Sequence, residues 1–234
     1  MHRFFGEIID NTAKILNPDY FHLKKVLRAK NKDKILVFSP LNEEYLCEIK
    51  DITKTEIICS VIKKIEKKKC IETNVFFPLM KRKAMDTAVR ICTEFGVSSF
   101  TPIITECSLK KYNDIDKVKK RWMNIHRESR KQSGSNIDMI MNKPDRIEKF
   151  ISFKNINIVP QPYTETKTKL ILKSDDKINL WLGPEAGFSE KEIELFKKYN
   201  FIFIKIAETV LKTETALAAG LGIIRYCEIN QQIT

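Results

Sequence analysis

The stretch LWLGPEAGFSEKEIELF, residues 180–196, reads as a strand, a tight loop and a helix in succession. The strand formers of residues 177–182 are followed at once by GPEAG. Glycine adopts backbone angles that are closed to other residues, while proline fixes φ and donates no backbone N–H. The strand is therefore expected to end at Leu182.

A helix is expected after this loop and again at the end of the chain. Ser189 and Glu192 have the spacing of a capping box, which predicts a helix beginning near Glu190. Downstream, IAETVLKTETALAAG, residues 206–220, repeats the pattern: residues 201–206 are almost wholly apolar, and helix formers follow from residue 213 to 226. Two such loops put unpaired N–H groups and positive helix ends at one edge of a sheet. The pair indicates a ligand pocket.

Composition sets the class of protein. The chain has 234 residues, 43% of them hydrophobic, enough for one large domain or two ordinary ones with a real core. Its formal net charge of +12 favours a polyanionic partner, with solvated surface lysines as the alternative. The excess is uneven and gathers at residues 63–69, 81–83 and 110–131.

Several site types and locations are not expected. The six cysteines include no CxxC pair, which argues against a zinc site or a disulfide framework. His2, His22 and His126 lack ligand or triad spacing, so structural or surface positions are expected for them. The N-terminus has no signal-peptide core, and no run of about 18 apolar residues occurs. We expect a cytoplasmic protein with no metal and no membrane contact.

The sequence has two regions with different patterns of predicted secondary structure. Short strands at residues 3–9, 34–39, 44–50 and 55–65, with a helix at 18–29, indicate a small β-barrel or half-barrel. An alternating α/β pattern follows, with strands at 75–79, 99–104 and 156–160 and helices at 81–95 and 114–132. A boundary near residue 71 is predicted, giving domains 1–70 and 71–234.

Four motifs in order resemble one family. GPEAGFSEKEIE with VLKTETALAAGL looks like the paired C-terminal motifs of the RsmE family, SPOUT-class methyltransferases that modify N3 of a uridine in small-subunit ribosomal RNA. MHRFF (1–5) and HLKKVLR (22–28) are similar to the family's PUA-like domain. Residues 81–108 resemble its first catalytic-domain helix and following strand. The resemblance covers nearly the whole chain.

The resemblance implies a fold and partners. It implies a PUA-like RNA-binding β-barrel over 1–70 and a SPOUT-type α/β sheet over 71–234 whose C-terminal part forms a trefoil knot. The loops at 182–187 and 206–213 would be the knot loops that bind S-adenosyl-L-methionine. It also implies a homodimer, with the cofactor site near the subunit interface, acting on 16S ribosomal RNA or the small ribosomal subunit.

The same resemblance implies cofactor-binding residues in the two loops. They are Leu182, Gly183, Pro184, Glu185, Gly187, Ile206, Val210, Leu211, Thr213 and Ala216. Leu182, Ile206 and Leu211 would flank the adenine, with plain core packing as the alternative. Glu185 would contact the cofactor or the partner subunit, or would only be a loop carboxylate held by backbone amides.

The chain departs from the family pattern at the second loop. Ala186 replaces the middle glycine of GPEGG, and IAET at 206–209 replaces LGPR, which removes an arginine suited to planar recognition. Lys212 also replaces an arginine. In KQSGS, residues 131–135, a lysine stands for the family's acid and a serine for its arginine.

Two residues are candidates for the chemistry. N3 of uridine carries a weakly acidic proton, so a base, or a cation that stabilises the deprotonated ring, assists methylation. Glu214 is the candidate base and Lys212 the candidate cation. The alternative for Glu214 is that it complements the dipole of the helix whose first turn it occupies.

Candidate RNA contacts follow the basic runs, and the target base must be flipped or single-stranded for its N3 to be reached. These residues are Lys24, Lys25, Arg28, Lys81, Arg82, Lys83, Arg127, Arg130 and Gln132, with His126 beside them on the long helix. Two other functions stay open: a non-catalytic RNA-binding assembly factor, favoured by the missing arginines, and a SPOUT methyltransferase with another RNA target or a ribose oxygen as acceptor.

Overall fold

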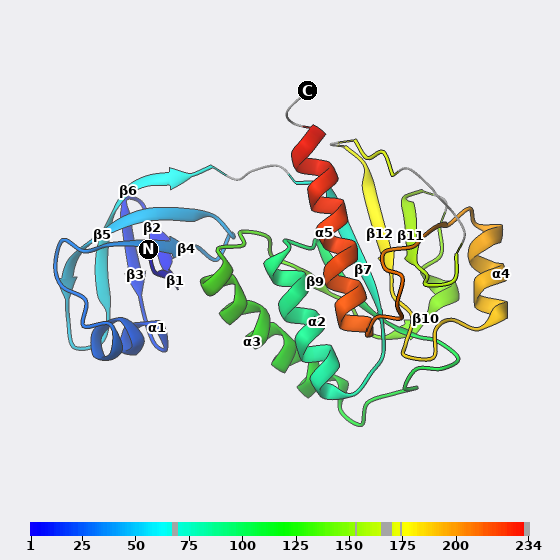
Figure 1. Ribbon diagram of the computed structural model, residues 1–234. Coiled ribbons are helices and arrows are strands. Elements are labelled where there is room, and N and C mark those ends of the chain that lie inside the picture. The colour runs from blue at the N-terminus through cyan, green and yellow to red at the C-terminus, as the bar shows by residue number, and fades with distance from the viewer. Residues whose placement is uncertain (67–69, 153, 165–169, 174, 232–234) are drawn as a thin grey trace. The chain divides into compact units, whose positions relative to one another are not determined.

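The computed structural model describes residues 1–66, 70–152, 154–164, 170–173 and 175–231 (Figure 1). The chain divides into two compact units. The first unit is Met1–Lys69 together with Arg130–Asp138, and the second is Cys70–Ser129 together with Met139–Thr234. Sequence patterns did not predict that Arg130–Asp138 packs with the first unit. Residues 67–69 of the predicted basic run lie outside the described residues.

The first unit is built on a curled mixed sheet of six strands in the order β1-β4-β5-β6-β3-β2. The strands are β1 (Arg3–Phe5), β2 (Glu7–Ile9), β3 (Thr12–Ile15), β4 (Lys34–Phe38), β5 (Glu44–Ile52) and β6 (Ile57–Ile65). Only the β1–β4 pair is parallel among these. The apolar residues on one face, among them Phe4, Val37 and Ile49, are buried and form a core of their own.

The helix predicted over residues 18–29 is shorter than expected. It consists of α1 (Asp19–Phe21) and a π-helical turn, η1 (His22–Val26). Arg28 has a φ of 52°, in the left-handed region, so the helix cannot continue through it. Strand β3, TAKI, was not predicted, although its residues alternate between half-buried and buried.

The second unit contains a parallel sheet in the order β10-β8-β7-β12-β11-β13, with β9 paired to β8. The strands are β7 (Glu72–Pro78), β8 (Ser99–Ile104), β9 (Ile140–Met141), β10 (Asp145–Arg146), β11 (Ile156–Pro160), β12 (Lys177–Trp181) and β13 (Ile202–Ile204). The helices are α2 (Arg82–Glu94), α3 (Ile115–Ser133), α4 (Glu190–Lys198) and α5 (Thr213–Gln231), with a short 3-10 turn η2 (Ile147–Lys149). The predicted strands at 99–104 and 156–160 have these bounds.

Helices cover both faces of this sheet (Figure 1). On one face, Leu180 of β12 packs in the cluster that includes Leu217 of α5 and Trp122 of α3. On the other, Trp181 packs in the cluster with Phe196 of α4. Because successive side chains of a strand point to opposite faces, a run that is buried on both sides is apolar throughout. In β12, Ile178 and Leu180 face the first cluster and Trp181 faces the second, while the buried side chain of Asn179 donates to Asn157 at 3.0 Å.

The predicted start of α4 is confirmed. The backbone N–H of Glu192 donates to Ser189 Oγ at 3.3 Å, and the backbone N–H of Ser189 donates to Glu192 Oε2 at 2.8 Å. The other oxygen of Glu192 accepts from the backbone N–H of Glu106 at 2.8 Å. The capping box therefore also anchors the segment after β8 to the start of α4.

Candidate functional site

Three parallel strands of the second unit end at one edge of the sheet. Strand β11 lies between β12 and β13, with Ile158 opposite Leu180 and Pro160 opposite Ile204. The chain passes from β11 to its neighbour β12 and then crosses back past β11 to β13, so the strand order reverses here. Ligands of α/β sheets bind in the crevice at such a point. A pocket of about 300 Å³ lies at this edge.

All ten residues predicted to bind a cofactor line this pocket. They are Leu182, Gly183, Pro184, Glu185, Gly187, Ile206, Val210, Leu211, Thr213 and Ala216. They come from the loops after β12 and β13 and from the first turns of α5. The structure thus brings together two segments that the sequence separates by about twenty residues, as expected when two parallel strands end at the same edge.

The first loop is a tight turn. The backbone N–H of Gly187 donates to the Pro184 carbonyl at 2.8 Å, and Gly187 has a φ of 76°. A Cβ built on Gly187 meets no atom within 4 Å, so that position faces open space. A Cβ on Gly183, in contrast, lies 3.2 Å from the ring of Phe188. A side chain at position 183 would crowd Phe188, whereas the absence of a side chain at Gly187 leaves the backbone of the turn accessible from the pocket.

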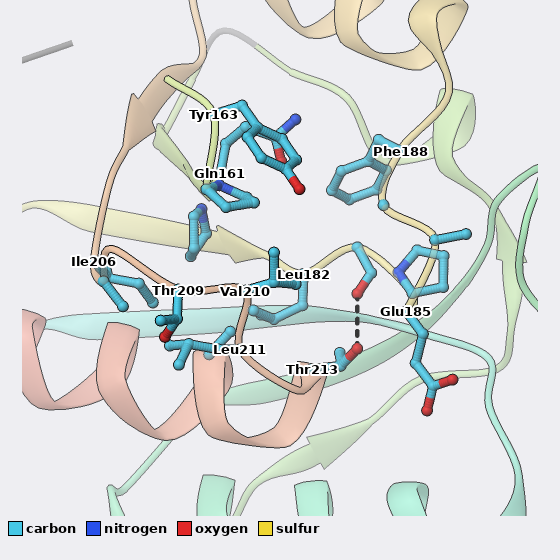
Figure 2. Close-up of a pocket in the computed structure, with 18 residues that line it drawn as sticks. Gln161, Tyr163, Leu182, Glu185, Phe188, Ile206, Thr209, Val210, Leu211 and Thr213 are labelled. Carbon is cyan, nitrogen blue, oxygen red and sulfur yellow. Dashed lines mark hydrogen bonds between the residues drawn. The ribbon is translucent and has the colours of Figure 1, made fainter. Parts of the chain in front are cut away.

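A hydrogen bond joins the two loops. Thr213, the first residue of α5, is buried, and its Oγ1 donates to the Gly183 carbonyl at 3.1 Å (Figure 2). The bond fixes the beginning of α5 to the end of the β12 strand. The two loops are therefore held as one wall of the pocket.

Sequence patterns missed a further wall, formed by Pro160 at the end of β11 and by Gln161, Pro162 and Tyr163 after it. The backbone N–H of Gln161 donates to the Ile204 carbonyl at 2.9 Å, which ties this segment to β13. Figure 2 shows Gln161 and Tyr163 across the pocket from the second loop. The expected strand at 156–160 was a usable signal, because the residues after it had to reach the same edge. Ala186, Phe188, Ala207 and Thr209 complete the lining.

The two candidate catalytic residues do not line the pocket. Lys212 is exposed and Glu214 is half-buried, and they flank the lining residue Thr213. Glu185 does line it, but its carboxylate points away from Gln161 and Tyr163 (Figure 2). The pocket itself therefore offers mainly apolar side chains, backbone groups and a few neutral polar groups.

Most of the candidate RNA contacts are exposed. In the second unit these are Lys81, Arg82 and Lys83 at the start of α2, and Arg127 on α3. In the first unit they are Lys25, Arg28 and Gln132. Each set presents positive charge on its own unit.

Lys24 and Arg130 require correction. Lys24 Nζ donates to the hydroxyl of Tyr20 at 2.6 Å and to the Thr53 carbonyl at 2.7 Å, so it holds the first unit together. Arg130 is only 3% exposed, its guanidinium lies 4.8 Å from the centre of the Phe38 ring, and its Nη1 donates to Asn42 at 3.0 Å. Burial lowers the pKa of Arg130. Neither side chain is placed as a surface phosphate contact.

His126 is likewise internal. Its ring is buried, with Nδ1 2.9 Å from the hydroxyl of Thr93, and its Nε2 accepts from the backbone N–H of Met139 at 3.2 Å. The idea that His126 approaches a target nucleotide is corrected: the ring packs inside the second unit.

The described residues hold neither a metal-binding cluster nor a membrane-spanning helix. They contain no group of three or more His, Cys, Asp or Glu side chains arranged to hold a metal ion. Within the same residues, no helix has the length and apolar character needed to cross a bilayer.

Two family models match the chain in separate regions. The model of an RNA methyltransferase domain matches residues 66–225, which contain the pocket. The model of an RNA methyltransferase PUA domain matches residues 15–62, within the first unit. The two matches follow the division that the structure shows except at Arg130–Asp138, which lies within the methyltransferase match but packs with the first unit.

Relatives of known name align over almost the entire chain. Ribosomal RNA small subunit methyltransferase E of Aquifex aeolicus is 30% identical over 229 residues, 96% of this chain and 99% of the relative. The protein of that name from Buchnera aphidicola subsp. Schizaphis graminum is 32% identical over 237 residues, 95% and 93% of the two chains. The crystal structure of a ribosomal RNA small subunit methyltransferase E from Neisseria gonorrhoeae bound to S-adenosyl methionine superposes with a TM-score of 0.83 at 19% identity over 97% of each chain, which shows a common fold.

Proposed function

We propose that this chain, which belongs to the ribosomal RNA small subunit methyltransferase E family, transfers a methyl group from S-adenosyl-L-methionine to N3 of one uridine in 16S ribosomal RNA. One observation carries the proposal for the site: ten residues chosen from the sequence as cofactor contacts line a single pocket. That pocket lies in the region matched by the RNA methyltransferase domain.

The pocket suits the proposed cofactor. Its volume of about 300 Å³ is at the lower end of the range for small-molecule sites. Leu182, Val210 and Leu211 supply apolar surface for an adenine ring, while Gln161 and Thr209 add polar groups. The open space beside Gly187 lets a ligand approach the backbone N–H and C=O groups of the turn.

The chain positions the reactants more than it reacts with them. When bound, S-adenosyl-L-methionine supplies an electrophilic methyl group on a sulfonium. The bond from Thr213 to Gly183 holds both loops in one geometry, so less ordering remains to be done when the substrate arrives. The apolar lining keeps water from the sulfonium, which favours a step in which charge is neutralised.

We propose that Glu214 accepts the N3 proton and Lys212 stabilises the anionic ring, since both flank the pocket residue Thr213. Glu214→Gln should lower kcat by about 100-fold or more, in the range of general-base catalysis, with little change in cofactor affinity. Glu190→Gln is the matched control, because Glu190 occupies the first turn of α4. Equal turnover in the two variants would leave Glu214 with only a role at the helix terminus.

If the basic residues at the start of α2 contact RNA phosphates, the affinity for RNA should depend on salt concentration. The slope of log affinity against log salt concentration is negative for binding that involves phosphates. Replacing Lys81, Arg82 and Lys83 with alanine should reduce the magnitude of this slope by about 2 to 3, at roughly 0.7–0.9 per phosphate contact. The change is measured by filter binding of 16S ribosomal RNA at several salt concentrations. The control removes the same charge from Lys191, Lys197 and Lys198 of α4. An unchanged slope for the α2 variant would exclude the α2 start from the RNA interface.

We further propose a homodimer and a trefoil knot formed by the two pocket loops and α5. An exposed face of α5 supports the dimer: Gly222, Tyr226 and Ile229 follow helical spacing, the last two are 70% and 60% exposed, and a Cβ on Gly222 meets nothing within 4 Å. Light scattering should give twice the chain mass. A crystal structure of the chain tests the knot.

Deletion of the gene tests the function. Mass spectrometry of 16S ribosomal RNA from the deletion strain should show one methyl group lost from a uridine base. Because the proposed substrate is ribosomal RNA, we also propose that the protein acts in the cytoplasm. Loss of a ribose methyl group instead would favour the other SPOUT activity. Calorimetry with S-adenosyl-L-methionine separates the remaining alternative, because a non-catalytic assembly factor does not need to bind the cofactor.

A further inference from the structure

Methyl transfer requires the target base to bind at the rim of the pocket. The target atom must come within near-attack distance of the methyl group, so the target base has to lie beside the cofactor pocket. A flipped base loses its stacking neighbours, at a cost of a few kcal/mol. Proteins that bind unstacked bases recover this cost by offering an aromatic ring. The rim of the pocket is therefore where such a ring is needed.

The pocket lining contains two aromatic side chains, and only one is available. Phe188 is 9% exposed and packs edge-on against Phe196, with ring centres 4.8 Å apart, so it belongs to the core beneath the pocket. Tyr163 is 82% exposed, although it lines the same pocket. In Figure 2 its ring lies beside Gln161, across the pocket from Leu211 and Thr213.

The segment that carries Tyr163 is stiff. Pro160 and Pro162 fix φ at two of its four positions, and Gln161 between them is tied to β13 by its backbone N–H. A ring presented by a stiff segment loses little conformational entropy when a ligand stacks on it. The amide of Gln161 adds one donor and one acceptor group beside the ring.

Two planar rings could stack in this pocket, the adenine of the cofactor and the target base of the RNA. We distinguish them by how deep in the pocket each would lie. The buried lining residues, Leu182, Pro184 and Thr213, define the inner part, which the proposed cofactor fills. Tyr163 stands outside them and meets what arrives from solvent. We propose that Tyr163 is the stacking platform for the unpaired target base of the RNA. This inference rests on the proposed methyltransferase function.

Three substitutions test the platform on small ribosomal subunits isolated from a strain lacking the gene. Tyr163→Ala and Tyr163→Leu should lower kcat/KM by about 10- to 100-fold, the range for loss of one base–aromatic stack. Tyr163→Phe keeps the ring and should stay within about twofold of the unaltered protein. Calorimetry should give the same Kd for S-adenosyl-L-methionine in all four proteins.

Each contrary outcome has a distinct meaning. A Kd for S-adenosyl-L-methionine that rises with the loss of the ring would assign Tyr163 to the adenine and overturn the proposal. Unchanged kcat/KM in Tyr163→Ala would also overturn it while leaving the methyltransferase function intact. If the unaltered protein transfers no methyl group, the proposed function fails instead. Filter binding of 16S ribosomal RNA then still decides, because Tyr163→Ala should bind more weakly than Tyr163→Phe.

Discussion

Gly187→Val should weaken binding of S-adenosyl-L-methionine by about 100-fold or more, as expected when a ligand loses several backbone hydrogen bonds. Gly187 lines the pocket and a Cβ there meets no atom within 4 Å, so we expect the valine side chain to take space that the cofactor needs. The φ of 76° adds backbone strain, at roughly 1–2 kcal/mol for a non-glycine residue. Isothermal calorimetry measures the affinity, and circular dichroism checks that the fold is retained.

Gly96→Val is the matched control for that strain. Gly96 follows α2 with a φ of 63° and does not line the pocket. The two variants should lose similar stability, and only Gly187→Val should lose cofactor affinity. Retained affinity in Gly187→Val would mean that the cofactor binds elsewhere, and equal loss in both variants would make backbone strain the cause.

Trp181→Ala should destabilise the second unit by about 3–5 kcal/mol, the usual cost of removing a large buried aromatic side chain. Trp181 is fully buried, stacks on Phe76 with ring centres 3.9 Å apart, and donates from Nε1 to Asn157 at 3.0 Å. At roughly 2–4 °C per kcal/mol for a chain of this size, Tm should fall by about 6–20 °C. Differential scanning calorimetry measures the shift.

Trp181→Phe separates ring packing from the hydrogen bond. It keeps an aromatic ring over Phe76, and Asn157 still accepts from Asn179 at 3.0 Å. A cost of about 1–2 kcal/mol is expected, as for a modest volume change and one lost bond. Because Trp181 immediately precedes the pocket loop, the alanine variant should also bind the cofactor more weakly. An unchanged Tm in Trp181→Ala would contradict the packing described for β12.

Much of the second unit could be predicted because its local signals agree with its packing. Ser189 and Glu192 form a capping box that needs no distant partner, and the apolar residues Ile178, Leu180 and Trp181 of β12 fit a strand in a sheet covered on both faces. Parallel strands then bring their loops to one edge, so the sequence alone is enough to predict that the two loops meet.

The sequence-based predictions are wrong where contacts with residues far away in the chain determine the position of a side chain. The sequence around Arg130 is that of an exposed basic helix, but Phe38 and Asn42, both far earlier in the chain, contact its guanidinium. Lys24 is captured by a carbonyl of the β5–β6 turn in the same way. Tyr163 was missed for another reason: its segment carries no motif, and its place at the pocket follows only from the register of β11 against β13.

One measurement addresses the central claim directly. Small ribosomal subunits from a strain lacking the gene are incubated with the purified protein and S-adenosyl-L-methionine carrying an isotopically labelled methyl group, and the 16S ribosomal RNA is digested to nucleosides for mass spectrometry. We expect the label in 3-methyluridine alone, at one site, with Gly187→Val inactive in the same assay. Label on a ribose, label on another base, or no transfer by the unaltered protein would contradict the account.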